Sequence, residues 1–383
     1  MLSLILLILG IGAILSESLM LFLWIGARLQ YRQEKISSYT PKACIIIPCK
    51  GTHDSFQENI KAFYNQNYND YIIIFVTDSS KDPAYRAIKN IFSGDPKIKL
   101  VTSELIQGCS GKISALIKGI KVAGDVEVYV FADSDIKPHK NWLRYLISSL
   151  NEEKVGATTG YRWYFPYNLK SLLMSAWNLA TILPFFYDRL NYAWGGSTAI
   201  KRVIFQKTGV EQAWMTGFAD DLILTGAVKK HGYKIKFVPK CVVESCSDEN
   251  LSDFIRWGNR QFTWVRWYYP STWTISFIRM AGVKFLTIFG IFLIIFGYII
   301  PGLLMVSTIL ITIIYGGIGF NTLKKAMHYT KKDIGSTLGY ALMMPIVTFI
   351  NAYNYLSSLF MKEIIWGGRR YRKSDVSKTT KNK

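Results

Sequence analysis

Charged residues, and acidic ones above all, are scarce in this sequence of 383 residues. Only 19% of the residues are charged, and 26 Asp and Glu stand against 46 Lys and Arg, which gives a net charge of +20. Half of the residues are hydrophobic, and the mean hydropathy is +0.16. This composition excludes a disordered chain and a highly charged soluble rod. The basic excess indicates contact with something anionic, such as nucleic acid, a phosphorylated substrate or the inner leaflet of a membrane.

Cysteine is also scarce, and its spacing excludes two structural uses. The five cysteines are too few and too scattered for the disulfide framework of a small secreted domain. No two of them form a C-x-x-C pair, so a zinc site is not indicated. The sequence predicts reduced thiols in a cytosolic compartment at Cys44, Cys49, Cys109, Cys241 and Cys246.

The first long apolar run covers residues 2–26, which at roughly 1.5 Å per residue can cross a hydrocarbon core of about 30 Å. It has no basic n-region and no small-residue cleavage site, and Arg28, Arg32 and Lys35 follow it. This pattern predicts a retained anchor with its N-terminus outside, rather than a signal peptide. Because a carboxylate is costly in lipid, Glu17 is predicted to snorkel or to face another helix, with a functional role as the alternative.

Three more apolar runs predict membrane helices near the C-terminus; they cover about 283–300, 302–320 and 335–360. Pro301 and Gly302 leave room only for a tight turn, so the first two runs are predicted to form a helical hairpin. The connection to the third run is predicted to lie on the cytosolic side, because it contains Lys324, Lys325, Lys331 and Lys332. A fourth crossing would carry the basic tail outside. Two alternatives follow. The last apolar run lies partly in the interface, or the run crosses the membrane and the basic tail breaks the positive-inside rule.

These runs divide the chain into an anchor, a large domain, a set of helices and a tail. The predicted bounds are 1–29 for the anchor, 30–275 for a cytosolic domain, 276–362 for the C-terminal membrane helices and 363–383 for the basic tail. Two segments of the domain have interfacial character. Residues 168–190 are apolar and aromatic with charged ends, which favours a helix on the interface over a buried core helix. Residues 252–270 interleave Arg with Trp, as belt helices at membrane surfaces do.

The large domain alternates buried strands with helices, which is typical of an α/β fold. Strands are predicted at 42–51, 71–80, 97–103 and 126–135, and helices at 55–67 and 111–123. This alternation predicts a parallel sheet covered on both faces. In such sheets ligands bind at the carboxyl ends of the strands, where Asp78, Asp133 and Asp135 are placed.

The acidic pair Asp133 and Asp135 is suited to a hard divalent cation. Two carboxylates at a sheet edge can hold such an ion together with substrate phosphates, so a strongly basic chain with this site indicates a nucleotide diphosphate substrate. The alternative is that D-S-D is only a polar turn. Asp78 has a simple alternative too, as the N-cap of the helix that begins near Pro83.

Two later segments add candidate site residues. In WGGSTAIKRVIF, Gly195 and Gly196 are placed before a helix and would let the backbone approach a ligand closely. Asp220 and Asp221 begin another predicted helix. Capping explains one of them, whereas two adjacent carboxylates repel each other and raise a pKa toward that of a working base.

The order of these motifs resembles the membrane-bound family 2 glycosyltransferases, and most closely their ceramide glucosyltransferase branch with its bacterial relatives. The motifs are PCKG, an Asp at a strand end, G-x-x-G-K-I-x-A-L, D-S-D, GGS, A-D-D-L-I-L, an Arg/Gln/Trp segment and a closing element, Trp366 to Arg372. The resemblance covers nearly the whole chain. It implies the GT-A fold, an α/β, Rossmann-like domain that handles nucleotide-diphospho-sugars.

The resemblance also implies roles for individual residues. Asp78 would contact the nucleotide base with Lys50 nearby, and Lys112 would lie close to the diphosphate. Asp133 would face the nucleotide sugar and Asp135 would bind Mg²⁺ or Mn²⁺, which makes the pair the metal site. Donor contacts are also expected at Gly195, Gly196 and Asp220, which stands where Glu is commoner; Asp221 matches the general base.

One motif of the family departs from its usual form. The Q-x-x-R-W pattern is not present in strict form. In the first partial match, before Arg256 and Trp257, Asp253 stands where Gln or Arg is expected, and in the second Thr263 stands where Arg is expected. We favour the second match, so the residues expected around diphosphate and acceptor are Arg260, Gln261, Trp264 and Arg266.

By resemblance, the expected activity is inverting, metal-dependent transfer of glucose from UDP-glucose to the hydroxyl of a ceramide- or diacylglycerol-like membrane lipid, which gives a β-glycolipid. The alternative is a processive polysaccharide synthase of the cellulose or hyaluronan type, although about four spans are few for a secretion channel. No nucleic-acid recognition module is visible, and no obligate protein partner is inferred. The expected location is multi-pass in a bacterial inner membrane, with the catalytic domain in the cytosol.

Overall fold

The computed structural model describes residues 1–31, 36–245, 250–328 and 335–380, and the chain separates into two compact units. The helical unit comprises Met1–Arg32, Tyr164–Leu183 and Asp248–Ile364. The α/β unit comprises Gln33–Trp163, Pro184–Ser247 and Ile365–Lys383. Predictions that concern Arg32, Lys35, Cys246, Lys331 and Lys332 fall outside the described residues.

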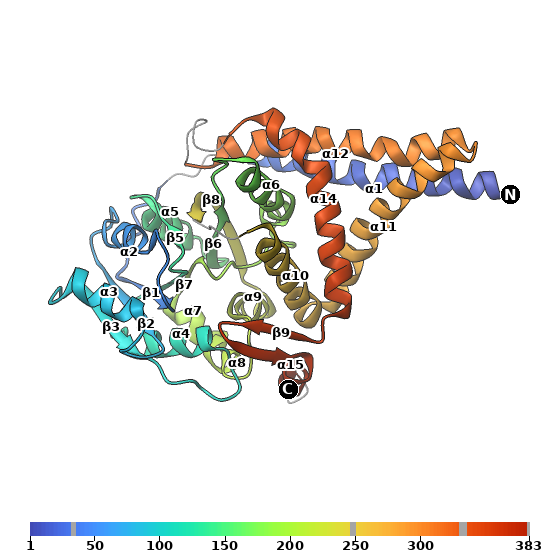
Figure 1. Ribbon diagram of the computed structural model, residues 1–383. Coiled ribbons are helices and arrows are strands. Elements are labelled where there is room, and N and C mark those ends of the chain that lie inside the picture. Colours follow the sequence, from blue (N-terminus) through green and yellow to red (C-terminus); the bar gives the residue numbers. More distant parts are fainter. Residues whose placement is uncertain (32–35, 246–249, 329–334, 381–383) are drawn as a thin grey trace. The chain divides into compact units, whose positions relative to one another are not determined.

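The helical unit is built from long helices. They are α1 (Leu2–Gln30), α6 (Leu169–Ile182), α10 (Leu251–Tyr268), α11 (Pro270–Ile295), α12 (Ile299–Ala326) and α14 (Thr337–Phe360) (Figure 1). Helix α12 packs against α1, α11 and α14. Among the described residues four helices are long and apolar enough to cross a membrane, namely α1, residues 169–186, α11 and α12. Helix α14, which covers the last predicted run, is not one of these four and has Asn351 and Asn354 on its buried face.

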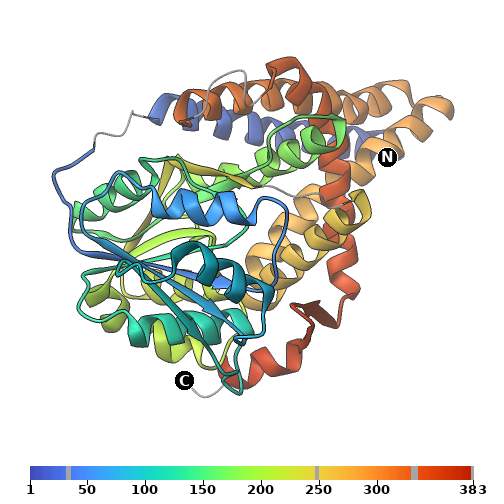
Figure 2. The same ribbon diagram turned by 60° about the vertical axis from the view of Figure 1, so that its left-hand side comes forward.

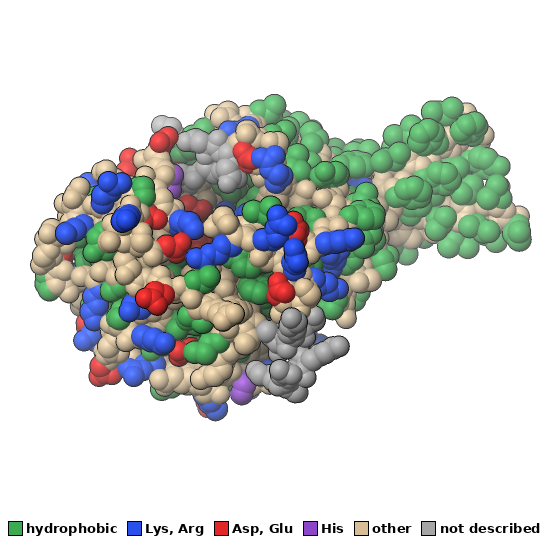
Figure 3. Space-filling model, turned by 60° about the horizontal axis from the view of Figure 1, so that its bottom comes forward, with side chains coloured by type: hydrophobic (Ala, Val, Ile, Leu, Met, Phe, Trp, Pro, Cys, Tyr) green, Lys and Arg blue, Asp and Glu red, His purple; other side chains and the backbone are tan. Residues whose placement is uncertain are grey.

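The outer surface of α1, α11 and α12 is hydrophobic, as expected for helices that face lipid. Large apolar side chains such as Ile8, Phe22, Phe285 and Leu310 are each more than half exposed. Figure 3 shows a nearly continuous hydrophobic face over these helices. The interior is different, because Glu17 of α1 is fully buried and its carboxylate lies 2.8 Å from Nζ of Lys284 on α11. The prediction that Glu17 faces another helix is therefore confirmed.

The predicted turn of the helical hairpin is displaced in the structure. Helix α11 ends at Ile295 and α12 begins at Ile299, so the turn lies at residues 296–298 and uses Gly297 at a φ of 86°. Pro301 and Gly302 lie inside the first turn of α12 instead. Proline is tolerated there, because the first backbone N–H groups of a helix have no partner within the helix.

The α/β unit is organised around an eight-stranded sheet with the order β3-β2-β1-β4-β7-β6-β8-β5. Its strands are β1 (Ala43–Cys49), β2 (Tyr71–Thr77), β3 (Ile98–Thr102), β4 (Val128–Ala132), β5 (Ile136–Lys137), β6 (Val155–Trp163), β7 (Ser197–Lys201) and β8 (Lys234–Ser245). The pairs among β1 to β4 are parallel, as predicted. Beyond these four predicted strands the sheet is mixed, because β7 pairs antiparallel with both β4 and β6, and β5 pairs antiparallel with β8.

Helices cover both faces of this sheet (Figure 2). They are α2 (Phe56–Tyr64), α3 (Pro83–Phe92), α4 (Gly111–Val122), α5 (Trp142–Ser148), α7 (Arg202–Lys207), α8 (Val210–Trp214) and α9 (Asp220–Lys230). A hairpin of β9 (Glu363–Trp366) and β10 (Arg369–Arg372) and helix α15 (Lys373–Thr380) follow near the C-terminus. Asp82 caps α3 by accepting from the N–H of Ala84 at 2.8 Å, so Asp78 is not that cap.

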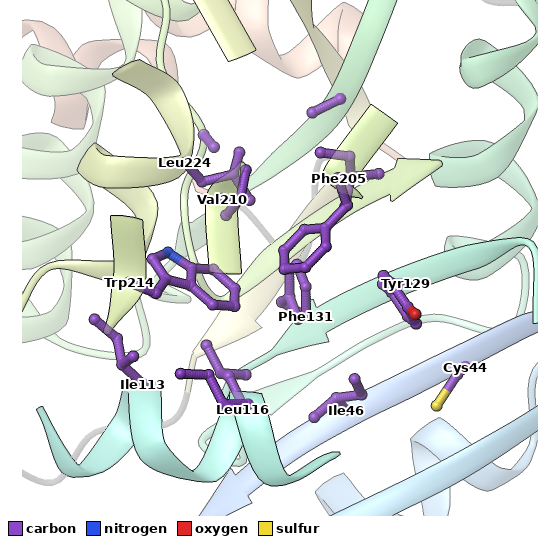
Figure 4. Close-up of a cluster of buried hydrophobic side chains, with 14 of the residues drawn as sticks. Cys44, Ile46, Ile113, Leu116, Tyr129, Phe131, Phe205, Val210, Trp214 and Leu224 are labelled. Carbon is purple, nitrogen blue, oxygen red and sulfur yellow. The ribbon is translucent and has the colours of Figure 1, made fainter. Parts of the chain in front are cut away.

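The core on one face of the sheet holds α4 and α9 in place. Ile113 and Leu116 of α4 pack with Phe131 of β4, Trp214 of α8 and Leu224 of α9 in one buried cluster (Figure 4). The indole N–H of Trp214 also donates to the carbonyl of Asp220 at 2.8 Å. The N-terminal residues of both helices are thereby fixed at the edge of the sheet.

Candidate active site

The mixed sheet brings three strand ends to the same edge. Strand β4 runs into Asp133, and the antiparallel β7 begins directly opposite, because Ala132 pairs with Ser197. Gly195 and Gly196 precede β7, so the prediction that they precede a helix is corrected: five residues of strand come first, and α7 starts at Arg202. Strand β6, antiparallel to β7, ends at this edge too.

Lys112 is the cation at the centre of the acidic cluster. Its Nζ lies 2.7 Å from Oδ1 of Asp133 and 3.3 Å from Oδ2 of Asp220, and its side chain is only 14% exposed. Burial by itself lowers the pKa of Lys112, but attraction to Asp133 and Asp220 outweighs it, so the pKa is raised. Lys112 therefore stays protonated and ties the D-S-D loop to the start of α9.

Arg162 of β6 is a second buried cation that sequence reasoning missed. Its Nη2 lies 3.7 Å from an oxygen of Asp133 and 3.7 Å from an oxygen of Asp135. Burial raises the pKa of Asp133, but Lys112 and Arg162 outweigh it and the pKa is lowered. For Asp135, burial and the neighbouring Asp133 prevail and the pKa is raised. The D-S-D sequence is thus more than a polar turn, because both carboxylates form ion pairs with cations whose side chains are only 10% and 14% exposed.

The two glycines are required by close packing around this network. A Cβ atom at Gly195 would lie 2.3 Å from Oδ2 of Asp220 and 2.9 Å from Nζ of Lys112. A Cβ atom at Gly196 would lie 2.8 Å from Oδ2 of Asp133. The backbone passes so close to the charged atoms that any side chain would displace them.

Asp221 lies beside this network and has the properties of a base. Its Oδ1 accepts from the N–H of Leu222 at 2.7 Å, and the N–H of Gly195 also donates to the carboxylate. Burial, together with the negative charge of Asp220, raises the pKa of Asp221 to about 7. The carboxylate can therefore take up a proton near neutral pH.

Asp78 follows β2 and forms a second cluster with the C-terminal hairpin. Oδ2 of Asp78 lies 3.0 Å from Nζ of Lys50 and 3.9 Å from Nη2 of Arg369. Lys50 also donates to the carbonyl of Gly367 at 2.9 Å. The guanidinium of Arg369 lies against Gly111, where a Cβ atom would be 2.7 Å from Nη1. Arg369 thus connects Asp78 with the start of α4, next to Lys112.

Arg369 carries a free hydrogen-bond donor at this position. Its Nη1 is buried and has no hydrogen-bond partner among the residues that the structure describes. Tyr371 lies on the same side of β10, where its ring packs 5.0 Å from that of Phe218 and its hydroxyl accepts from the N–H of Gly111. The sequence shows the basic tail, but it does not show that the C-terminal hairpin packs on residues more than 150 positions earlier in the chain.

The remaining predicted residues belong to the helical unit. Arg260, Gln261 and Trp264 belong to α10 of the helical unit, so their roles toward donor and acceptor stay predictions. Arg266 bonds the carbonyls of Leu359 and Met361, where it stabilises the C-terminal end of α14.

The donor set of the acidic pair fits a divalent cation incompletely. Oδ1 of Asp135 is buried without a hydrogen-bond partner in the described part of the chain, and such an orphaned oxygen suits a hard cation. Nevertheless, no group of three or more His, Cys, Asp or Glu side chains that could hold a metal ion occurs among these residues. Within the described ranges only the pair Asp133 and Asp135 is available, and substrate oxygens or water would supply further ligands.

Comparison with known proteins connects this geometry with sugar transfer. The family model of glycosyl transferase family 21 matches residues 5–378. A mannosyltransferase from Pyrobaculum calidifontis, solved with GDP-Man and Mn²⁺, superposes with a TM-score of 0.52 at 16% identity over 94% of this chain and 98% of that one. GalNAc-T7, solved with UDP, GalNAc and Mn²⁺, matches with a TM-score of 0.41 at 14% identity over 62% of this chain and 56% of that one.

Proposed function

This chain is a glycosyltransferase that belongs to glycosyl transferase family 21 and has a GT-A fold, and we propose that it transfers glucose from UDP-glucose to the hydroxyl of a membrane lipid. The acceptor is of the ceramide or diacylglycerol type. The reaction inverts the donor's α linkage, so that the product is a β-glycolipid.

One observation carries this proposal. Asp133, Asp135, Asp220 and Asp221, which are up to 88 positions apart in the sequence, meet around Lys112 at the carboxyl edge of the sheet. A sugar–diphosphate bond breaks with negative charge building on the leaving phosphate. At this edge, cations can stabilise the negative charge of the leaving phosphate. A carboxylate with a pKa near neutral can accept the proton of the acceptor hydroxyl.

The donor is expected to lie along the two clusters. Asp78 and Lys50 would contact the base, and Lys112 and Arg369 would lie along the diphosphate. Asp133 and Asp135 would hold Mg²⁺ or Mn²⁺, and the Mn²⁺ in the mannosyltransferase structure supports a divalent ion here. When bound, the ion supplies positive charge for the departing diphosphate. Interactions of this kind accelerate the reaction because they are stronger in the transition state than with bound donor.

Asp221 is proposed as the general base. Its carboxylate would take the proton of the acceptor hydroxyl as that oxygen attacks the anomeric carbon from the face opposite the diphosphate. A single displacement of this kind inverts the configuration at the anomeric carbon.

The pKa of Asp221 predicts a pH dependence of the rate. Only the ionised carboxylate can accept a proton, so kcat/KM should rise about tenfold per pH unit well below pH 7 and level off about one unit above it. In Asp220→Asn the neighbouring charge is absent, and the inflection should move to lower pH because repulsion no longer raises the pKa of Asp221. The pH profile of kcat/KM checks both. A wild-type profile that stays flat down to pH 5 would contradict the role of Asp221.

The acceptor is proposed to be a lipid because several helices have the length and composition of membrane spans. In the described part of the chain four helices are apolar and long enough to cross a membrane, and the outer faces of α1, α11 and α12 are hydrophobic. The catalytic unit would lie in the cytosol, where UDP-sugars and reduced cysteines are both expected. The membrane would be a bacterial inner membrane.

Arg369 gives a prediction that separates diphosphate binding from base binding. Arg369→Ala should weaken UDP binding about tenfold or more and leave uridine binding unchanged, because a charge-assisted hydrogen bond to phosphate is lost. Arg370→Ala is the matched control, since the neighbouring residue of β10 is exposed on the opposite side of the strand. Calorimetric titration with UDP and uridine measures the effect. If the two variants bound UDP with equal affinity, Arg369 would not be a donor-binding residue.

A product assay tests the proposed function as a whole. Purified full-length protein is incubated with a panel of labelled UDP-sugars and a membrane lipid extract, and the lipids are analysed by mass spectrometry. The proposal predicts one added hexose on a ceramide or diacylglycerol, with UDP-glucose as the preferred donor. Long polysaccharide chains, or transfer to water-soluble acceptors without competition from lipids, would contradict it.

A further inference from the structure

We propose that Arg162 is an internal counter-cation of the acidic pair Asp133 and Asp135, which makes binding of the divalent cation conditional on the nucleotide diphosphate. This inference rests on the proposed function, because it concerns the metal and donor of the same site. Arg162 is then a positioning residue, which acts through the carboxylates of Asp133 and Asp135.

The four oxygens of the acidic pair show how little of the pair is free for a metal. Oδ1 of Asp133 lies 2.7 Å from Nζ of Lys112. Oδ2 of Asp133 and Oδ2 of Asp135 each lie 3.7 Å from Nη2 of Arg162. Only Oδ1 of Asp135 is buried without a hydrogen-bond partner among the described residues. Three of the four oxygens therefore already face a protein cation.

The backbone of Arg162 is held in the sheet, and its guanidinium lies over an aromatic ring. The residue is 8% exposed, it lies on the sheet strand β6, and its guanidinium packs over the ring of Trp194 at 5.2 Å. The backbone of Trp194 is itself held, because its main-chain N–H donates to Oγ1 of Thr159 at 2.9 Å. A buried guanidinium placed between two carboxylates neutralises charge that would otherwise attract a divalent ion.

A divalent ion that enters without nucleotide meets two obstacles. It has to compete with Lys112 and Arg162 for the carboxylate oxygens, and the chain offers no third acidic, His or Cys ligand in the described ranges. Mg²⁺ and Mn²⁺ prefer about six oxygen or nitrogen ligands. The site of the nucleotide-free protein is therefore expected to bind these ions weakly.

A nucleotide diphosphate removes both obstacles. Its phosphate oxygens supply the missing ligands, and they also offer the guanidinium of Arg162 an alternative anionic partner with matching geometry. When Arg162 turns from the carboxylates to the diphosphate, Asp133 and Asp135 become available to the metal. Metal and nucleotide would then bind cooperatively and enter as one complex.

Binding of Mn²⁺ to the full-length protein in detergent at pH 8, followed by the electron paramagnetic resonance signal of free Mn²⁺, tests this inference. Wild-type protein should bind Mn²⁺ at least about tenfold more weakly without UDP than with saturating UDP, after correction for Mn–UDP in solution. Arg162→Gln should bind Mn²⁺ without UDP about tenfold or more tightly than wild type, because the competing charge is gone. Arg162→Lys should lie near wild type.

Arg202→Gln is the matched control, because Arg202 pairs with the exposed Asp125 at 3.2 Å and belongs to neither cluster of the site. Its Mn²⁺ affinity should equal that of wild type. Tight Mn²⁺ binding by nucleotide-free wild type would overturn the inference even if Arg162→Gln did not fold. Unchanged affinity in a folded Arg162→Gln would overturn it too. These outcomes differ from failure of the proposed function, in which wild type neither binds UDP nor transfers sugar.

Discussion

Asp221→Asn is expected to lower the rate of sugar transfer by about three orders of magnitude while UDP affinity stays within about twofold. Asn has nearly the same shape as Asp but cannot accept the proton of the attacking hydroxyl. The amide oxygen can keep the contact of the side chain with the N–H of Leu222. Single-turnover transfer and titration with UDP measure the two effects separately.

The stability of this variant serves as its control. The folded-state pKa of Asp221 is raised to about 7, above that of an unfolded Asp, so its ionised form opposes folding as the pH rises through 7. Asp221→Asn should therefore melt at a higher temperature than wild type at pH 8. Asp188→Asn, an exposed carboxylate that pairs with Lys234, should leave the rate unchanged. Near-normal transfer by Asp221→Asn would exclude Asp221 as the base.

Lys112→Met is expected to have the largest effect on stability and also to abolish transfer. The side chain is 14% exposed and neutralises Asp133 and Asp220, which are 23% and 8% exposed. Removing one partner from a buried network leaves uncompensated charge, which costs about 3 kcal/mol. A drop of several degrees in melting temperature should accompany the loss of activity.

A double variant separates charge from packing at this position. Adding Asp220→Asn to Lys112→Met removes one of the uncompensated carboxylates, so part of the lost stability should return without any activity. Lys121→Met, an exposed position on the same helix, should melt like wild type. If Lys112→Met also melted like wild type, the ion pairs of Lys112 would not contribute to folding.

Much of the site could be predicted from local sequence, because carboxylates that follow buried strands or begin helices have a defined place in an α/β sheet. Asp133 at the end of β4 and Asp220 at the start of α9 are such cases. The predicted family resemblance and the GT-A fold are confirmed by the family model and the mannosyltransferase structure. The order of the motifs along the chain made the prediction of family and fold possible, because it specifies which strand ends meet.

The basic partners of these carboxylates could not be predicted, since they depend on long-range pairing. Strand β6 reads VGATTGYRW and is buried at every position, so it lacks the alternation that marks a strand. Without β6 and the antiparallel β7, nothing places Arg162 beside Asp133. The same holds for Arg369, because no local pattern shows that the C-terminal hairpin packs on Gly111 and Lys50.

The anomeric configuration of the glycolipid tests the central claim most directly. The lipid formed from α-linked UDP-glucose by the full-length enzyme can be purified, and the coupling between the protons at C1 and C2 of its sugar can be read by NMR. Direct attack by a hydroxyl activated at Asp221 predicts the large coupling of a β-glucoside. A small coupling would show an α-glucoside. That result would contradict the single displacement and the role of Asp221 as its base.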